Sequence, residues 1–252
     1  MDGDGQEELA VTRDAVSGAR WYVYRYAAGG GFVNEHPMEL RHSSGSGWAA
    51  GVRASDAAFG DVDGDGLDEL VVSRDAQSGA RLYVYQLHGA LASRAIGSGW
   101  MTGIVRHVAV GDVDRDGVAE IVFGRDVLVA HDPRWGVIDE AAGYTTTLGG
   151  GFDWQGESIA SLAIGAIDRS RGYPTLAVGV SGGGASRLEL MTFQVRDDEL
   201  GVGDFSRVVP PGGASVRSVA LGDVDGLGGD EIAYGVMAAQ QAGYGVRVLP
   251  AP

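Results

Sequence analysis

Short runs of apolar and β-branched residues follow one another along the whole chain and are separated by glycine-rich turns. Examples are residues 106–111, 120–124 and 144–148 in one part of the chain, and 83–85 and 90–96 in another. Short runs bounded by turn residues are typical of β-strands, whereas an amphipathic helix needs apolar positions at a period of 3.6 over a longer stretch. The pattern therefore predicts an all-β protein.

An acidic segment recurs between these runs. Residues 59–75 return almost unchanged at 110–126. More degenerate copies lie at 2–14, 164–176 and 221–235. Equivalent acids in neighbouring copies are 51 to 61 residues apart, which gives a repeat period in the range of propeller blades. The repeat divides the chain into five units, at approximately residues 1–50, 51–100, 101–154, 155–211 and 212–252.

Each unit contains about four predicted strands, and four strands in about 50 residues are typical of a propeller blade. Small residues fall in the first strand of three units, at Ala109, Ala163 and Ala220, where strands crowd a central axis. We therefore expect a β-propeller of about five four-stranded blades. The first unit lacks its innermost strand and the fifth ends after its third, at 245–249. We expect blades that are incomplete at both ends, with exposed sheet edges that favour self-association.

Composition narrows the classes of function. The 19 basic residues are all arginines and face 34 acidic residues, which gives a net charge of −15. Such a chain repels phosphate backbones, so nucleic acid is excluded as a partner. There is no cysteine, so disulfides and thiolate metal sites are excluded. No apolar run reaches the roughly 18 residues that cross a bilayer, and the N-terminus has no signal-peptide pattern.

The acidic segments have the donor pattern of a calcium loop. Asp61, Asp63 and Asp65 alternate with other residues, a glycine at position six permits a sharp turn, and Glu69 follows at position nine. The carbonyl of Leu67 supplies a further oxygen. Hard oxygen donors in this number suit Ca²⁺ better than a softer metal. The second full loop has Asp112, Asp114, Asp116, the Val118 carbonyl and Glu120.

An EF-hand loop begins in the same way but requires a bidentate glutamate at position twelve. Val72 and Phe123 occupy that position here, and the flanking runs are strand-like rather than helical. The loop is therefore expected to link two strands. Four such loops hold 17 of the 34 acidic residues, and bound cations would relieve the repulsion among them.

An acidic loop of this spacing, between a Phe-Gly-like strand end and an apolar strand, resembles the FG-GAP (VCBS) repeat of the integrin α-subunit β-propeller and its bacterial and lectin-like relatives. The resemblance implies Ca²⁺ held by the two full loops on one face, with ligand contacts on the opposite face. It also implies a secreted or cell-surface location. Degenerate loops would retain the ligands Asp2, Asp4 and Glu8 in the first unit and Asp223, Asp225 and Glu231 in the fifth. The fourth unit has Ala166 and Ser170 at ligand positions, and we expect no metal there.

Candidate ligand-binding residues gather in the turns at the other end of each unit. Tryptophans occur at matching positions, and an Arg-Asp pair opens each of three hairpins. Aromatic faces beside arginine and aspartate suit a sugar-binding pocket, but both features also serve as packing wedges and turn-fixing ion pairs in a repeat fold. The candidates are Trp48, Trp100, Trp154, Arg13, Asp14, Arg74, Asp75, Arg125 and Asp126.

Nothing in the sequence indicates a catalytic site. The five histidines, His36, His42, His88, His107 and His131, occupy unrelated places in their units, and no nucleophile-base arrangement accompanies them. We therefore predict a non-catalytic, calcium-binding recognition module whose ligand is a glycan. The alternatives are a protein-adhesion module and an accessory domain of a secreted polysaccharide-degrading enzyme.

Overall fold

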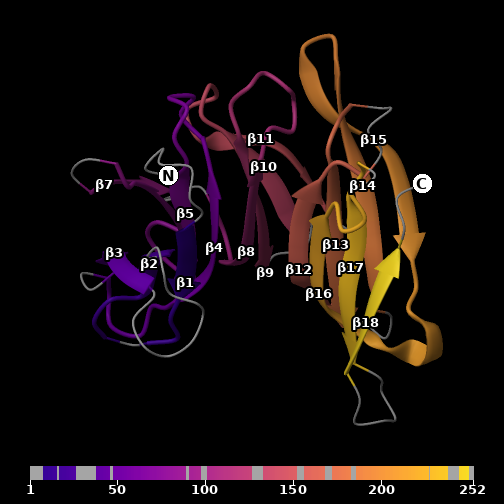
Figure 1. Ribbon diagram of the computed structural model, residues 1–252, viewed down its shortest axis with the longest axis horizontal. Coiled ribbons are helices and arrows are strands. Elements are labelled where there is room, and N and C mark those ends of the chain that lie inside the picture. The colour runs from indigo at the N-terminus through magenta and orange to yellow at the C-terminus, as the bar shows by residue number, and fades with distance from the viewer. Residues whose placement is uncertain are drawn as a thin grey trace.

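The computed structural model describes most of the chain, and its described residues form five antiparallel sheets that follow one another in sequence order. In Figure 1 the first sheet (indigo) lies on the left of the molecule and the fifth (yellow) on the right. The described residues are 8–15, 17–26, 38–45, 48–88, 91–97, 101–126, 133–151, 156–167, 172–182, 186–226, 228–237 and 244–249. The fold is the expected all-β propeller of five blades.

Three blades have four described strands and the two end blades have three. The first sheet contains β1 (Glu8–Thr12), β2 (Trp21–Tyr26) and β3 (Met38–Ser44). The second contains β4 (Ala54–Gly60), β5 (Glu69–Arg74), β6 (Leu82–Gln86) and β7 (Ala92–Ile96), and the third contains β8 (Ile104–Gly111), β9 (Glu120–Asp126), β10 (Trp135–Asp139) and β11 (Thr145–Gly150). The fourth contains β12 (Glu157–Gly165), β13 (Thr175–Gly182), β14 (Arg187–Arg196) and β15 (Glu199–Val208), and the fifth contains β16 (Ser215–Gly222), β17 (Glu231–Met237) and β18 (Tyr244–Leu249).

Strands within each sheet pair in the order of the sequence, as expected for a blade that meanders outward from its first strand. The only described helix is the 3₁₀ turn η1 (Pro211–Gly213). No helix in the described part of the chain has the length and apolar character needed to cross a lipid bilayer. The first described strand, β1, follows an acidic loop and so corresponds to the second strand of the other blades, as the repeat predicted.

The core consists of four clusters, one between each pair of neighbouring sheets. The cluster between the second and third sheets contains Val71 and Val84 from one side and Ile121 and Phe123 from the other. Alternate residues of a strand point to opposite faces, so Leu70 and Tyr85 of the second sheet instead pack on Trp21 of the first. Each inner blade is therefore buried on both faces, which explains its continuous runs of apolar residues.

Glycines at the ends of the first strands let neighbouring sheets approach closely. A Cβ at Gly60 would lie 2.3 Å from Val110 of the next sheet, and one at Gly111 would lie 3.2 Å from Ile164. At the equivalent Gly222 of the fifth sheet, a Cβ would meet no atom of the described residues within 4 Å. The recurrent glycine after the first strand is thus a packing residue wherever another blade follows.

The outer faces of the two end sheets carry exposed apolar residues. Leu9 pairs with Tyr24 as Leu70 pairs with Tyr85, yet Leu9 is exposed whereas Leu70 is buried. Val248 of the fifth sheet is likewise exposed. These faces correspond in register to the faces that pack between inner blades. Self-association through the sheet edges stays a prediction.

Candidate functional site: the acidic loops

The acidic loops lie together at one end of the sheets, which we call the loop face. In the second to fifth blades each joins the first strand of the blade to the second. Neighbouring loops contact each other through the backbone: the Ala119 N–H donates to the Asp61 carbonyl at 2.8 Å, and the Asp230 N–H donates to the Ala166 carbonyl at 2.9 Å. The hairpins between second and third strands lie at the opposite end, which we call the hairpin face.

In the second blade, backbone N–H groups hold the aspartates of the loop in place. Asp61 Oδ2 accepts from Gly66 at 2.8 Å, Asp63 Oδ1 from Asp65 at 3.2 Å, and Asp65 Oδ1 from Leu67 at 2.9 Å. Gly66 has φ = 87°, which a side chain would disfavour. One oxygen of each aspartate is fixed by these bonds, so the loop keeps three negative charges close together.

Glu69 completes the loop from the first position of β5. Its side chain is fully buried, and Oε2 accepts the Val62 N–H at 3.1 Å. Its other oxygen, Oε1, is buried without a hydrogen-bond partner among the described residues, and so is Oδ1 of Asp61. Burial, with the neighbouring charge of Asp63 second, raises the pKa of Glu69 from 4.5 to about 7. A buried carboxylate without a compensating partner is costly, and a cation would offset that cost.

The third blade repeats this arrangement. Asp114 Oδ1 accepts from Asp116 N at 3.1 Å, and Asp116 Oδ1 accepts from Val118 N at 2.8 Å. Asp112 receives two backbone N–H groups, from Arg115 at 2.6 Å and Gly117 at 3.2 Å. Glu120 is buried, accepts the Val113 N–H at 2.7 Å, and has its pKa raised from 4.5 to about 8, chiefly by burial. Burial also raises the pKa of Asp114.

The degenerate loops differ from one another. In the fifth blade, Asp223, Asp225 and the buried Glu231 stand together, and Glu231 accepts the Val224 N–H at 2.7 Å. In the first blade, Glu8 begins β1, whereas Asp2 and Asp4 lie outside the described residues. Residues 168–171 of the fourth loop lie outside the described residues, and before them Asp230 of the next blade accepts the Ala166 N–H at 2.5 Å.

The donor sets fit a hard divalent cation. Asp61, Asp63 and Glu69 each place a ligand atom within 4.8 Å of the others, as do Asp112, Asp114 and Glu120, and the trio of the fifth blade. All these donors are carboxylate oxygens, which is the chemistry that Ca²⁺ prefers. The fit is supported by one oxygen of Glu69 and one of Asp61, which are buried without a hydrogen-bond partner among the described residues and which a bound cation would satisfy.

Comparison with known families agrees with this arrangement. A sequence model described as "FG-GAP-like repeat" matches residues 1–72 and 61–123, which contain the first three acidic loops. The chain is an FG-GAP repeat β-propeller. No curated protein matches it.

Three solved structures are similar to this FG-GAP propeller at low identity. They are the exotype rhamnogalacturonan lyase YesX (18% identity, TM-score 0.43), a rhamnogalacturonan lyase PL11 of Bacillus licheniformis (19%, 0.45) and the rhamnogalacturonan lyase YesW (17%, 0.44). Each match covers 89% of this chain and 49% or 50% of the lyase. The chain therefore spans about half the length of these enzymes, and at this similarity their substrate is not transferred to it.

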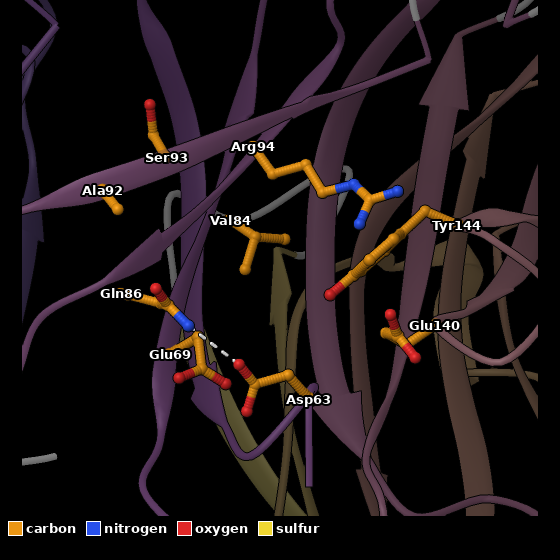
Figure 2. A pocket seen from close by; sticks show the side chains of 9 residues that line it. All are labelled: Asp63, Glu69, Val84, Gln86, Ala92, Ser93, Arg94, Glu140 and Tyr144. Atoms are coloured by element: carbon orange, nitrogen blue, oxygen red, sulfur yellow. Dashed lines mark hydrogen bonds between the residues drawn. The ribbon is translucent and has the colours of Figure 1, made fainter. Parts of the chain in front are cut away.

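The loop face of the FG-GAP propeller contains a cavity of about 250 Å³ between the second and third blades. Asp63 and Glu69 of the second blade's acidic loop line one side, and Arg94 and Tyr144 line the other (Figure 2). The Arg94 guanidinium lies 4.3 Å from the centroid of the Tyr144 ring. Burial, with Glu140 second, raises the pKa of Tyr144 to about 12, so its hydroxyl stays protonated and able to donate. This cavity could not be predicted from the sequence, because residues from two blades line it.

On the hairpin face, Trp48 is the one candidate tryptophan within the described residues, and its ring packs against neighbouring side chains. Trp48 stacks on Tyr83 with ring centroids 5.8 Å apart, and the Arg74 guanidinium lies 4.7 Å from the Trp48 centroid. Arg74 is buried. Trp48 thus contacts the second sheet as a wedge would, while Trp100 and Trp154 lie outside the described residues. A ligand site on the hairpin face stays a prediction.

The Arg-Asp pairs of the hairpins have contacts with residues outside the pairs. Their aspartates bind elsewhere: Asp14 pairs with Arg53 at 2.9 Å, and Asp126 pairs with Arg106 at 3.0 Å. Asp75 Oδ1 accepts the backbone N–H of Arg53 at 2.5 Å. The arginines of these pairs, besides Arg74, also have contacts of their own: Arg13 donates to the Tyr22 hydroxyl at 3.1 Å, and Arg125 to the carbonyls of Pro133 at 2.7 Å and Thr102 at 2.9 Å.

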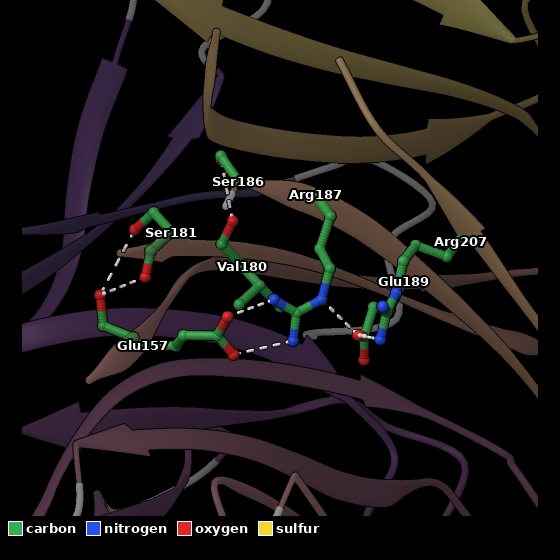
Figure 3. A network of polar contacts seen from close by, with 8 residues as sticks. Glu157, Val180, Ser181, Ser186, Arg187, Glu189 and Arg207 are labelled. Carbon is green, nitrogen blue, oxygen red and sulfur yellow. Dashed lines mark hydrogen bonds and ion pairs between the residues drawn. The ribbon is translucent and has the colours of Figure 1, made fainter. Parts of the chain in front are cut away.

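A buried ionic network in the fourth blade was not predicted. Arg187 donates to both oxygens of Glu157, at 2.5 and 2.8 Å, and to Glu189 at 2.5 Å (Figure 3). Arg207 also donates to Glu189, at 3.0 Å. These bonds raise the pKa of Arg187 further above its ordinary value, with the bond to Glu157 contributing most. The network joins β12, β14 and β15. It could not be predicted from the sequence because its members are far apart along the chain.

Proposed function

We propose that this FG-GAP propeller is a non-catalytic recognition module that binds calcium in its acidic loops and a carbohydrate ligand. The observation that carries the calcium proposal is Glu69, a fully buried carboxylate with one oxygen unpartnered beside Asp61 and Asp63. Keeping desolvated acids of such a cluster ionised costs free energy, and a cation that shares their oxygens would offset this cost. The same buried glutamate recurs as Glu120 and Glu231.

The carbohydrate proposal rests on the cavity beside the second loop. Its walls offer a neutral hydroxyl donor on Tyr144, the hydroxyl of Ser93, the amide of Gln86 and the charged Arg94. Gln86 is fixed by donating to Asp63 at 2.9 Å. Mixed donors and acceptors of this kind match the hydroxyl groups of a sugar, and hydroxyl oxygens are also ligands that Ca²⁺ accepts. A sugar would therefore bind next to the calcium loop.

The absence of catalysis is also part of the proposal. His107 is used in packing: Nδ1 lies 3.6 Å from Asp56 and Nε2 lies 3.2 Å from the Ile159 carbonyl. It thereby connects three consecutive blades.

Calcium at the millimolar level found outside cells would fill loops of modest affinity, so we propose an extracellular or cell-surface location.

Calorimetric titration of the metal-free chain with Ca²⁺, followed by a glycan array with and without calcium, tests the proposal. We expect calcium binding at the second and third loops and sugar binding that chelation abolishes. Arg94→Ala should weaken sugar binding, whereas the double variant Arg13→Ala/Asp14→Ala on the hairpin face should not. The reverse result would move the ligand to the hairpin face, and no heat on adding millimolar calcium would refute the metal proposal. Calcium binding without any sugar would favour a protein ligand instead.

A further inference from the structure

The second and third loops differ in one donor that the repeat does not contain. His88 follows β6 at the loop face, and its Nε2 lies 3.1 Å from Oδ2 of Asp65. His88, Asp65 and Glu69 each place a ligand atom within 4.8 Å of the others. Asp65 Oδ1 is held by the Leu67 N–H, so Oδ2 is the oxygen that faces the imidazole. The second blade therefore has a mixed nitrogen and oxygen donor set.

The third blade lacks this nitrogen. Val84 pairs with Val71 as Val137 pairs with Val122, so the register places Ala141 where the second blade has His88. Ala141 is exposed and brings no side-chain donor to the third loop. The two full loops are thus a natural matched pair that share three aspartates and a buried glutamate but differ in one imidazole.

A second observation points to a cation at the mixed site. Glu69 belongs to both donor groups of the second loop, with Asp61 and Asp63 on one side and with Asp65 and His88 on the other. Its side chain is fully buried and its Oε1 has no hydrogen-bond partner among the described residues. The His88 ring contacts Asp65 through Nε2, and its Nδ1 is buried without a hydrogen-bond partner among the described residues.

We propose that the second loop is a site for a divalent transition cation of the Zn²⁺ and Mn²⁺ class, with His88 as its nitrogen ligand beside Asp65 and Glu69. Imidazole nitrogen binds such cations well, whereas Ca²⁺ takes oxygen ligands. The third loop, with oxygens alone, selects hard cations. This inference rests on the proposed function of the loops as divalent-cation sites and adds a difference in selectivity between two of them.

Pulsed electron paramagnetic resonance of the whole chain loaded with Mn²⁺ tests the proposal. We expect nitrogen coupling to the bound Mn²⁺ that changes from ¹⁴N to ¹⁵N frequencies when histidine alone is ¹⁵N-labelled, which requires no mutation. His88→Ala should remove the coupling, and the matched control His42→Ala in β3 should keep it. Zn²⁺ affinity should fall by roughly tenfold or more in His88→Ala because a direct ligand is lost, while Ca²⁺ affinity stays unchanged.

Two outcomes overturn the inference in distinguishable ways. Mn²⁺ that binds without nitrogen coupling, or with coupling that His88→Ala leaves intact, would show that the imidazole only pairs with Asp65; the calcium proposal would stand. A chain that binds neither Ca²⁺ nor Mn²⁺ would overturn both the inference and the proposed function.

Discussion

Replacing Glu69 with glutamine should change the stability of the protein in opposite directions with and without calcium. Glutamine keeps the size of the side chain and an oxygen that can accept the Val62 N–H, but it carries no charge. In the metal-free protein the variant removes a buried carboxylate whose Oε1 has no partner among the described residues. In the calcium-bound protein the variant removes a ligand. The substitution therefore separates the free-energy cost of burying the Glu69 charge from the contribution of that charge to calcium binding.

The pKa of Glu69 gives the size of the effect. Because burial raises the folded-state pKa from 4.5 to about 7, this group's contribution to the stability of the metal-free fold is fully present below pH 4.5 and is lost as pH rises through 7. By linkage, ionising Glu69 costs the metal-free fold about 3 kcal/mol at pH 8 and less than about 1 kcal/mol at pH 5. Glu69→Gln should thus raise the metal-free melting temperature at pH 8 by roughly 6 °C or more, and at pH 5 by about 2 °C.

Thermal unfolding followed by circular dichroism, in chelator and in millimolar calcium, measures both effects. Asp68→Asn is the matched control, because it makes the same change of charge in the same loop outside the metal-ligand groups. We expect the control to show a small effect of the same sign in both conditions. A Glu69→Gln chain that is destabilised equally in chelator and in calcium would refute the reasoning, since the glutamate would then act only through its contacts in the fold.

Three further predictions concern the loops and the packing. About 1% of Glu69 is ionised at pH 5, so calcium should raise the melting temperature less at pH 5 than at pH 8; an equal rise at both would contradict proton competition at this ligand. Arg187→Met should lower the free energy of unfolding by about 3 to 5 kcal/mol in a urea titration, because Glu157 loses its arginine and Glu189 keeps only Arg207; a loss below that of a surface variant would count against it. Gly60→Ala should cost about 1 to 3 kcal/mol in the same titration because its Cβ meets Val110, whereas Gly222→Ala should be nearly neutral; equal effects would show that packing is not the cause.

The acidic loops and the strands could be predicted because each is formed by a short segment that recurs in every repeat unit. Residues 61–69 contain the aspartates, the turn glycines and the buried glutamate of one loop, all within nine positions. Their backbone bonds span two to seven residues, so spacing alone fixes which donor meets which acceptor. The same holds for the strands, whose boundaries follow the apolar runs and turn residues.

Contacts between blades could not be predicted in this way. The cavity combines Asp63 of one blade with Tyr144 of the next, and His107 of the third blade lies 3.6 Å from Asp56 of the second. Such pairs depend on how two sheets pack, and sequence spacing carries no information about that. His88 was noted in the sequence only as a lone histidine, since the β6 register that places it beside Asp65 appears only in the folded blade.

The sequence by itself determined the strands, the propeller class and the acidic loops, because each is a periodic or local pattern repeated from unit to unit. Tertiary structure alone decided which carboxylate oxygens are buried without a partner, which loop has a histidine beside it, and which hairpin residues are used in packing. Burial and proximity depend on the distances between blades, and these distances set the pKa values and the donor sets from which the function is proposed.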